Sequence, residues 1–135
     1  LAAAARKAGV EVRAGDVALI RSGWGRYFGD AHAFLGHDTG VPGPTEEAAR
    51  WLADRGVRAT GAETIAYEQI KPEIGHALLP VHRLLLVERG VHIIEVMNLA
   101  GLAEAGVSEF LFVLAPLKIV GGTGSPVRPV AVVGR

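Results

Sequence analysis

The sequence predicts an α/β protein with a largely buried mixed sheet, and three observations favour this class. Short, continuously apolar segments alternate with segments of helical character along the 135 residues. The apolar segments are only four or five residues long, which is typical of strands that are buried on both faces. Half of the residues are hydrophobic, enough for the core of one domain.

The individual elements follow from these patterns. The first helix is expected over residues 1–8 and ends at Gly9, because glycine readily adopts the left-handed conformation after a helix. The helix that starts at Pro44 has acidic residues in its first turn, which favour the positive end of the helix dipole. The segment Arg21–Gly43 has no clear period and is expected to be a long loop. The other expected elements are strands at Val17–Ile20, near Ala59, at Val91–Ile94, Phe110–Leu114 and Val130–Val133, and helices at 81–89 and Leu99–Ala105.

Composition excludes several classes of protein. The 14 basic residues balance the 14 acidic ones, so there is no electrostatic reason to expect nucleic acid or an anionic membrane as a partner. The chain has no cysteine, which excludes disulfides, thiolate metal sites and cysteine nucleophiles. No apolar run approaches the roughly 20 residues of a membrane helix. We therefore expect a cytoplasmic protein without membrane or nucleic-acid partners.

Several motifs are weak. The glycine-rich loop Gly121–Ser125 resembles a phosphate cradle, but no Lys-Ser or Lys-Thr follows it, so a tight turn is the better interpretation. Ser125 lacks the G-x-S-x-G context of a catalytic serine. The histidines show no tight ligand spacing. His32, His37 and His76 are expected at the surface or as caps, whereas His92 lies in an apolar strand and is expected to be a hydrogen-bonded core residue.

The segment from His82 to Glu95 is the most informative. A helix that begins near His82 turns at Gly90 into the apolar strand that ends at Glu95. Packing of this helix on the strand would bring His82 close to Glu95, and imidazole with carboxylate is half a metal site or half an acid–base pair. His82 alone also fits a polar residue on a first helical turn. Glu95 at the edge of a buried strand needs a partner, which a salt bridge, a histidine or a metal could provide.

Seven segments, in order, resemble the cyclase family of metal-dependent hydrolases, which includes bacterial kynurenine formamidase and isatin hydrolase. The resemblance spans nearly the whole chain and corresponds to the C-terminal two-thirds of the family's fold. No single segment is diagnostic, but their order is. The segments are Gly15–Trp24, Ala49–Val57, Gly61–Thr64, Val81–Leu85, Ile93–Glu95, Leu114–Lys118 and Gly121–Pro129.

The resemblance implies a swivelling β/β/α domain that assembles as a homodimer or homotetramer. It implies a divalent metal, zinc or manganese, which activates water to hydrolyse a cyclic amide or an N-formyl aryl amine. Family members bind the metal mainly through an H-x-G-T-H-x-D motif, followed by an acid–base histidine, and a later histidine and glutamate complete the site. His82 and Glu95 match these two positions, and Trp24 matches the loop that closes over the substrate. Without the resemblance, an anchor of its own loop is the better interpretation of Trp24 than an aromatic that stacks on substrate.

Three departures accompany the resemblance. The H-x-G-T-H-x-D motif is absent from residues 1–135, so we expect one cyclase domain without its N-terminal part, a fragment that is catalytically inert alone. Glu63 stands where the family commonly has Asp, and Val96 where it commonly has Asn. The alternative to a hydrolase is a non-catalytic remnant of the fold that acts as an oligomeric binding or structural module.

Overall fold

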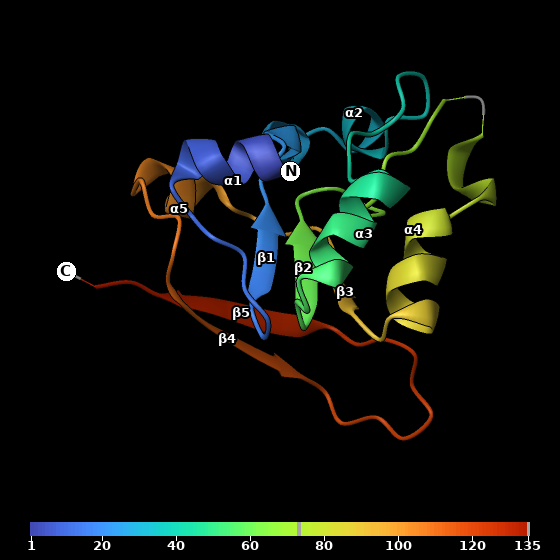
Figure 1. Ribbon diagram of the computed structural model, residues 1–135. Coiled ribbons are helices and arrows are strands. Elements are labelled where there is room, and N and C mark those ends of the chain that lie inside the picture. Colours follow the sequence, from blue (N-terminus) through green and yellow to red (C-terminus); the bar gives the residue numbers. More distant parts are fainter. Residues whose placement is uncertain (73, 135) are drawn as a thin grey trace.

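The computed structural model describes residues 1–72 and 74–134, apart from the side chain of His76. The chain alternates helices and strands, as the sequence predicts (Figure 1). The elements are α1 (Ala2–Ala8), β1 (Val17–Ile20), η1 (Trp24–Tyr27), α2 (Ala31–Leu35), α3 (Glu46–Asp54), β2 (Ala59–Ala62), η2 (Gly75–Ala77), α4 (Pro80–His82), η3 (Arg83–Glu88), β3 (His92–Ile94), α5 (Ala100–Glu104), β4 (Leu111–Pro116) and β5 (Val127–Val132).

A three-stranded parallel sheet lies at the centre, in the order β1-β2-β3 (Figure 1). Val17 of β1 pairs with Ala59 of β2, and Ala59 pairs with His92 of β3. All three strands therefore end at the same edge of the sheet. The residues that follow β2 and β3 meet at this carboxyl edge, where open parallel sheets commonly carry their functional groups.

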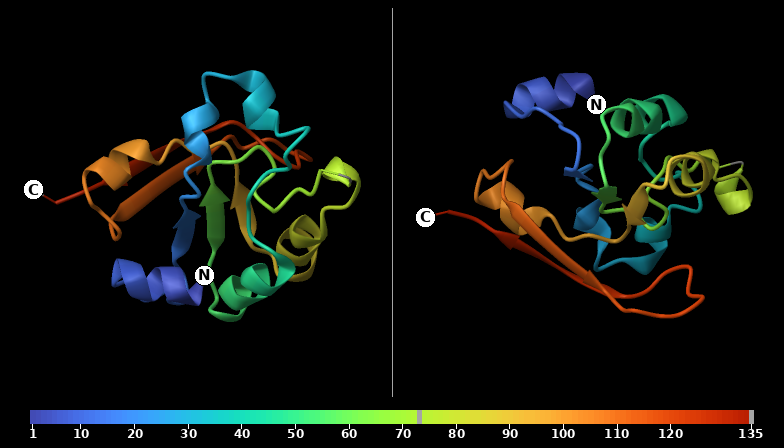
Figure 2. Two further views of the ribbon diagram at one scale, coloured as in Figure 1. Left: turned by 90° about the horizontal axis from the view of Figure 1, so that it is seen from above. Right: turned by 60° about the horizontal axis from the view of Figure 1, so that its bottom comes forward.

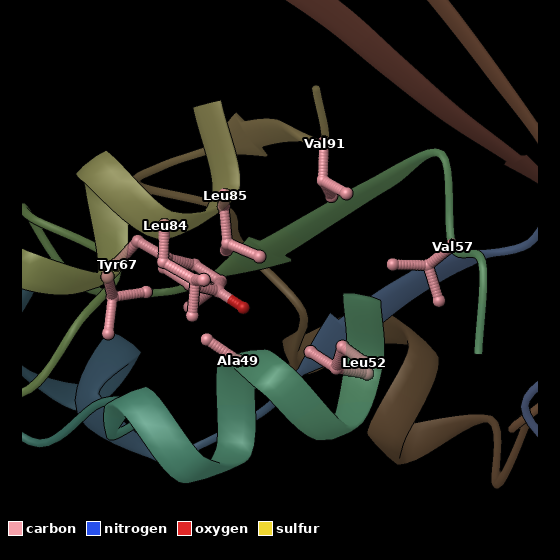
Figure 3. Close-up of a cluster of buried hydrophobic side chains, with 9 residues drawn as sticks. Ala49, Leu52, Val57, Tyr67, Leu84, Leu85 and Val91 are labelled. Atoms are coloured by element: carbon pink, nitrogen blue, oxygen red, sulfur yellow. The ribbon is translucent and has the colours of Figure 1, made fainter. Parts of the chain in front are cut away.

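Helices cover one face of the parallel sheet. Thr45 caps helix α3, because its side chain accepts a hydrogen bond from the Ala48 amide, and the helix buries Ala49 and Leu52. These side chains pack with Leu84 and Leu85 of η3 (Figure 3). The helix-side cluster consists of Ala49, Leu52, Val57, Ala62, Tyr67, Val81, Leu84, Leu85 and Val91. It fixes the helix that carries His82 against the sheet.

The antiparallel pair β4-β5 crosses the opposite face of the sheet (Figure 2). Its inward side chains Phe112 and Leu114 pack on a second buried cluster, which includes Ala59 and Ile94. The outward side chains of the same strands, Leu111, Val113, Val130 and Val132, are each at least 44% exposed. The α/β class is confirmed, but the parallel and antiparallel strands form two sheets rather than one mixed sheet.

Three local predictions need correction. The segment Arg21–Gly43 is not a continuous loop, because it contains η1 and α2; Asp30 caps α2 by accepting a hydrogen bond from the Ala33 amide. Strand β4 is half exposed rather than strongly buried, since only alternate residues face the second cluster. Strand β1 is only partly buried, because a groove of about 690 Å³ lies between it, α1, α5 and β4.

The helices of the described residues are all too short or too polar to cross a membrane.

Candidate metal centre

His82 is the last residue of α4, a helix that begins with Pro80 in the position where proline is best tolerated. The helix continues without a break as η3, whose turns are π-helical. Such turns are rare and occur frequently at functional sites. The buried Leu84 and Leu85 hold η3 on the sheet, and the His82 side chain remains 23% exposed. Packing therefore places a partly exposed histidine in the first turn of a helix that is held on the sheet.

The side chain of Glu68 contacts His82 from the loop after β2. Glu68 is only 2% exposed, and its carboxylate accepts hydrogen bonds from the backbone amides of Val81 (3.1 Å) and His82 (2.9 Å). A negative charge beside these amides also favours the positive end of the helix dipole. The His82 Nδ1 atom lies 2.7 Å from Glu68 Oε1. Glu68 thus contacts both the backbone and the ring of the histidine.

Glu95 approaches the other side of the ring. It follows β3 directly at the carboxyl edge of the sheet, and its Oε1 atom lies 3.3 Å from His82 Nε2. The backbone beyond Glu95 is fixed by two hydrogen bonds, from the Val96 amide to the Thr64 carbonyl and from the Met97 amide to the Ala62 carbonyl. The helix and strand therefore bring His82 and Glu95 together as the sequence predicts, and the main chain holds the segment that lacks the family's Asn.

The two carboxylates change the proton affinity of the imidazole. The pKa of His82 is raised above its ordinary value, chiefly by the hydrogen bond with Glu95. The Glu68 carboxylate adds to the increase, and partial burial opposes it. In the absence of a metal the arrangement therefore favours a protonated ring between two carboxylates.

The geometry also fits a metal ion. Two nitrogen and oxygen ligands of one tetrahedral zinc, each about 2.0–2.1 Å from the ion, lie roughly 3.3–3.4 Å apart. His82 Nε2 and Glu95 Oε1 have this separation, 3.3 Å. Among the described residues, however, no group of three or more histidine, aspartate or glutamate side chains is arranged to hold a metal ion. Taken by themselves, His82 and Glu95 are therefore a pair and not a complete metal site.

Trp24 and Glu63 are linked through one loop. Glu63 is 3% exposed, and its Oε2 atom accepts hydrogen bonds from the Gly23 amide (2.6 Å) and the Ser22 hydroxyl (3.1 Å). The Trp24 indole donates a hydrogen bond to the Phe34 carbonyl (2.9 Å) and packs against a small buried cluster around Ile70. These contacts show Trp24 as the anchor of its loop; contact with a substrate remains a prediction.

The remaining histidines lie apart from this centre. His32 is exposed and faces Asp38 at 3.6 Å, and His37 is also exposed. The prediction that His92 is a core residue is wrong, because it starts β3 at the exposed end of the strand. The predicted capping or surface role of His76 lies outside the described side chains.

In the Gly121–Ser125 loop, the Ser125 hydroxyl accepts a hydrogen bond from the Leu117 amide, as in a structural turn.

Sequence reasoning did not identify Glu68. The signal is present, because Glu68 interrupts the largely apolar segment 65–70. A buried charge in such a segment requires partners. Which partners it has depends on the fold, and only the structure shows that His82 is one of them.

Comparison with known proteins identifies the family. Residues 1–69, half of the chain, match the model of the cyclase family, described as "Putative cyclase". The chain belongs to this family. An isatin hydrolase from Roseibium aggregatum is 33% identical over 126 residues, which is 91% of this chain and 47% of that protein.

Solved structures of cyclase-family proteins have the same fold. An isatin hydrolase bound to the product analogue thioisatinate superposes with a TM-score of 0.81 at 30% identity, over 99% of this chain and 51% of the other. A potential metal-dependent hydrolase with cyclase activity gives a TM-score of 0.64 at 28% identity, over 92% of this chain and 54% of the other. The chain thus spans about half the length of the relatives that it matches.

Proposed function

We propose that this chain contributes to a metal-dependent hydrolase of a cyclic amide or an N-formyl aryl amine, in which His82 and Glu95 are two ligands of a divalent metal. The observation that carries the proposal is the 3.3 Å separation of His82 Nε2 and Glu95 Oε1 at the carboxyl edge of the parallel sheet. Relatives that hydrolyse isatin, a lactam, support the class of substrate.

The two ligands suit zinc and manganese alike, because both metals accept imidazole and carboxylate. A divalent metal at this position would polarise an amide carbonyl and activate water for hydrolysis. The proposed tasks of the chain itself are to hold His82 and Glu95 in place and to position Trp24 beside an aromatic or cyclic substrate. We further propose that the chain alone has little hydrolytic activity, since two ligands bind metal weakly.

Metal binding tests this proposal. Zinc and manganese should bind the purified chain, and His82→Ala and Glu95→Ala should each lower the affinity at least about tenfold. His92→Ala is a matched control, because His92 is an exposed histidine of the strand that leads to Glu95 but lies outside the pair. Isothermal titration calorimetry compares the wild-type chain with these three variants and with the double variant of His82 and Glu95. If the double variant of His82 and Glu95 binds metal as the wild-type chain does, the site is wrongly assigned.

Hydrolysis assays separate the proposal from the alternative of a non-catalytic binding or structural module. In a longer protein that contains this segment together with an H-x-G-T-H-x-D motif, the same two substitutions should lower hydrolysis of an N-formyl aryl amine or a lactam at least about tenfold. Full activity of both variants would exclude a role for these residues in the reaction. Rapid hydrolysis by the chain alone would contradict its proposed low activity.

A further inference from the structure

The turn that carries Glu68 is strained and firmly held. The Glu68 amide donates a hydrogen bond to the Ala66 carbonyl, two residues earlier, which closes a γ-turn around Tyr67. Tyr67 has φ of 57°, a left-handed conformation that is a real outlier for a bulky residue. Strain of this kind persists where the surroundings enforce it and is frequent at functional sites.

Two contacts enforce the turn. The Tyr67 side chain is completely buried in the helix-side cluster, and its hydroxyl lies 2.8 Å from the Thr60 hydroxyl (Figure 3). On the other side, the backbone of Tyr67 and Glu68 lies against Gly43 so closely that a Cβ atom at Gly43 would collide with it. The position of the Glu68 carboxylate is therefore determined by the core on one side and by a glycine on the other.

The hydrogen bonds of Glu68 determine the state of the histidine ring. An ionised carboxylate only accepts hydrogen bonds, and both ring nitrogens of His82 face one. Nδ1 lies 2.7 Å from Glu68 Oε1, closer than Nε2 lies to Glu95 Oε1, so we place the single hydrogen of a neutral ring on Nδ1. When the ring is neutral, this leaves the lone pair on Nε2. Nε2 is the atom that faces Glu95 at 3.3 Å. A carboxylate behind a ligating imidazole is a common means of fixing both its orientation and its tautomer.

We propose that Glu68 is a positioning residue, which holds His82 in the Nδ1–H tautomer with Nε2 directed at the metal site. The proposal rests on the proposed function, because it assigns Glu68 a role behind one of the proposed ligands. It also explains why a strained turn is kept beside the start of α4. Both oxygens of Glu68 accept hydrogen bonds from Val81 and His82, so we place it behind the histidine rather than on the metal.

The first test needs no substitution. Long-range ¹H–¹⁵N NMR spectra of the metal-free chain, with ¹⁵N-labelled histidine and at a pH high enough to make the ring neutral, report the tautomer of His82. His82→Gln assigns the signal by its loss. The expected result is the Nδ1–H tautomer. An Nε2–H tautomer in the wild-type chain would overturn the proposal, whether or not the chain binds metal.

The second test compares two buried carboxylates. Glu68→Gln should lower zinc affinity about 10- to 100-fold and reduce the population of the Nδ1–H tautomer, because a glutamine has only one acceptor oxygen. Glu63→Gln is the matched control, since Glu63 is equally buried but accepts hydrogen bonds from the Ser22 hydroxyl and the Gly23 amide instead. Glu68→Gln with unchanged tautomer and affinity would contradict the proposal. Zinc binding to neither wild type nor variant would contradict the proposed function alone, and the wild-type tautomer would still decide the role of Glu68.

Discussion

Glu63 and Glu68 both follow β2 and are both almost completely buried, yet the structure uses them differently. Glu63 accepts two hydrogen bonds on a single oxygen and ties down the loop before Trp24. Glu68 uses both oxygens, accepting from two backbone amides and the His82 ring. Burial alone therefore says little about the role of a carboxylate; the number of its oxygens in use and their partners decide it.

The difference also separates two parts of the carboxyl edge. The Glu63 side holds a loop in place through one side-chain hydroxyl and one backbone amide. The Glu68 side places a titratable ring between two carboxylates, on a helix fixed by the helix-side cluster. The chemistry that the structure supports lies on the Glu68 side, and the following changes test that distinction.

The largest effect is expected from loosening the helix that carries His82. Leu85 is completely buried between η3 and the sheet, and its carbonyl accepts a hydrogen bond from the Val91 amide (Figure 3). Leu85→Ala should lower the free energy of unfolding by about 2–5 kcal/mol. Leu86→Ala, a neighbour that is 45% exposed, should cost less than about 1 kcal/mol. Urea denaturation measures both, and equal losses would show that the helix-side cluster does not hold this helix.

The comparison of the two glutamates predicts the next largest effect. In Glu68→Gln, the side-chain oxygen can accept from only one of the two backbone amides, of Val81 or of His82, whichever way the glutamine group is turned. The other amide loses its acceptor, which should lower the free energy of unfolding by about 1–3 kcal/mol. Glutamine at position 63 keeps an oxygen for both donors and should cost less, about 0.5–1.5 kcal/mol. Urea denaturation of the two variants gives these free energies. A larger loss for Glu63→Gln would reverse the roles assigned here.

A smaller effect, of opposite sign, is expected beside Glu95. Val96 has φ of 55°, which is strained for a β-branched residue, and its side chain is 46% exposed. Asparagine tolerates this conformation, so Val96→Asn should stabilise the chain by about 1 kcal/mol. Val113→Asn, at a valine that is 47% exposed but has no positive φ, should not stabilise it. Thermal unfolding measures the change; destabilisation by Val96→Asn would show that the valine is held by packing.

The smallest effect is a pH dependence of the metal-free chain. The pKa of His82 is raised in the folded state, mainly by Glu95, so protonation of the ring stabilises the fold. This contribution is complete below the ordinary histidine pKa of about 6.5 and is lost as the pH rises through the folded value. With a chelator present, the unfolding free energy of the wild-type chain should therefore fall more between about pH 6 and pH 9 than that of His82→Gln. Parallel curves for the two proteins would contradict the raised pKa.

Much of the fold could be predicted from the sequence. The strand at Val17–Ile20, the helix that begins after Pro44 and the ends at Gly9 and Gly106 follow from local signals, namely apolar runs, capping residues and glycines. The exposure of β1 and β4 could not be predicted, because it depends on which faces the tertiary packing leaves open. The short helix at Ala31–Leu35 was missed, since five residues carry too little periodicity.

The candidate site could be predicted only in part. The pairing of His82 with Glu95 follows from a helix that packs on the strand after it, and the structure confirms their proximity. Glu68 could not be assigned, because it reaches His82 through a γ-turn at Tyr67 that no sequence signal predicts. That γ-turn is local strain enforced by distant residues, which is the kind of feature that sequence rules describe worst.

The most direct test of the account is a crystal structure of the chain grown with zinc, with anomalous diffraction measured at the zinc edge. An anomalous peak is expected about 2.0–2.2 Å from both His82 Nε2 and a carboxylate oxygen of Glu95, with Nδ1 still hydrogen-bonded to Glu68. Zinc bound elsewhere, with His82 and Glu95 still in direct contact, would contradict it.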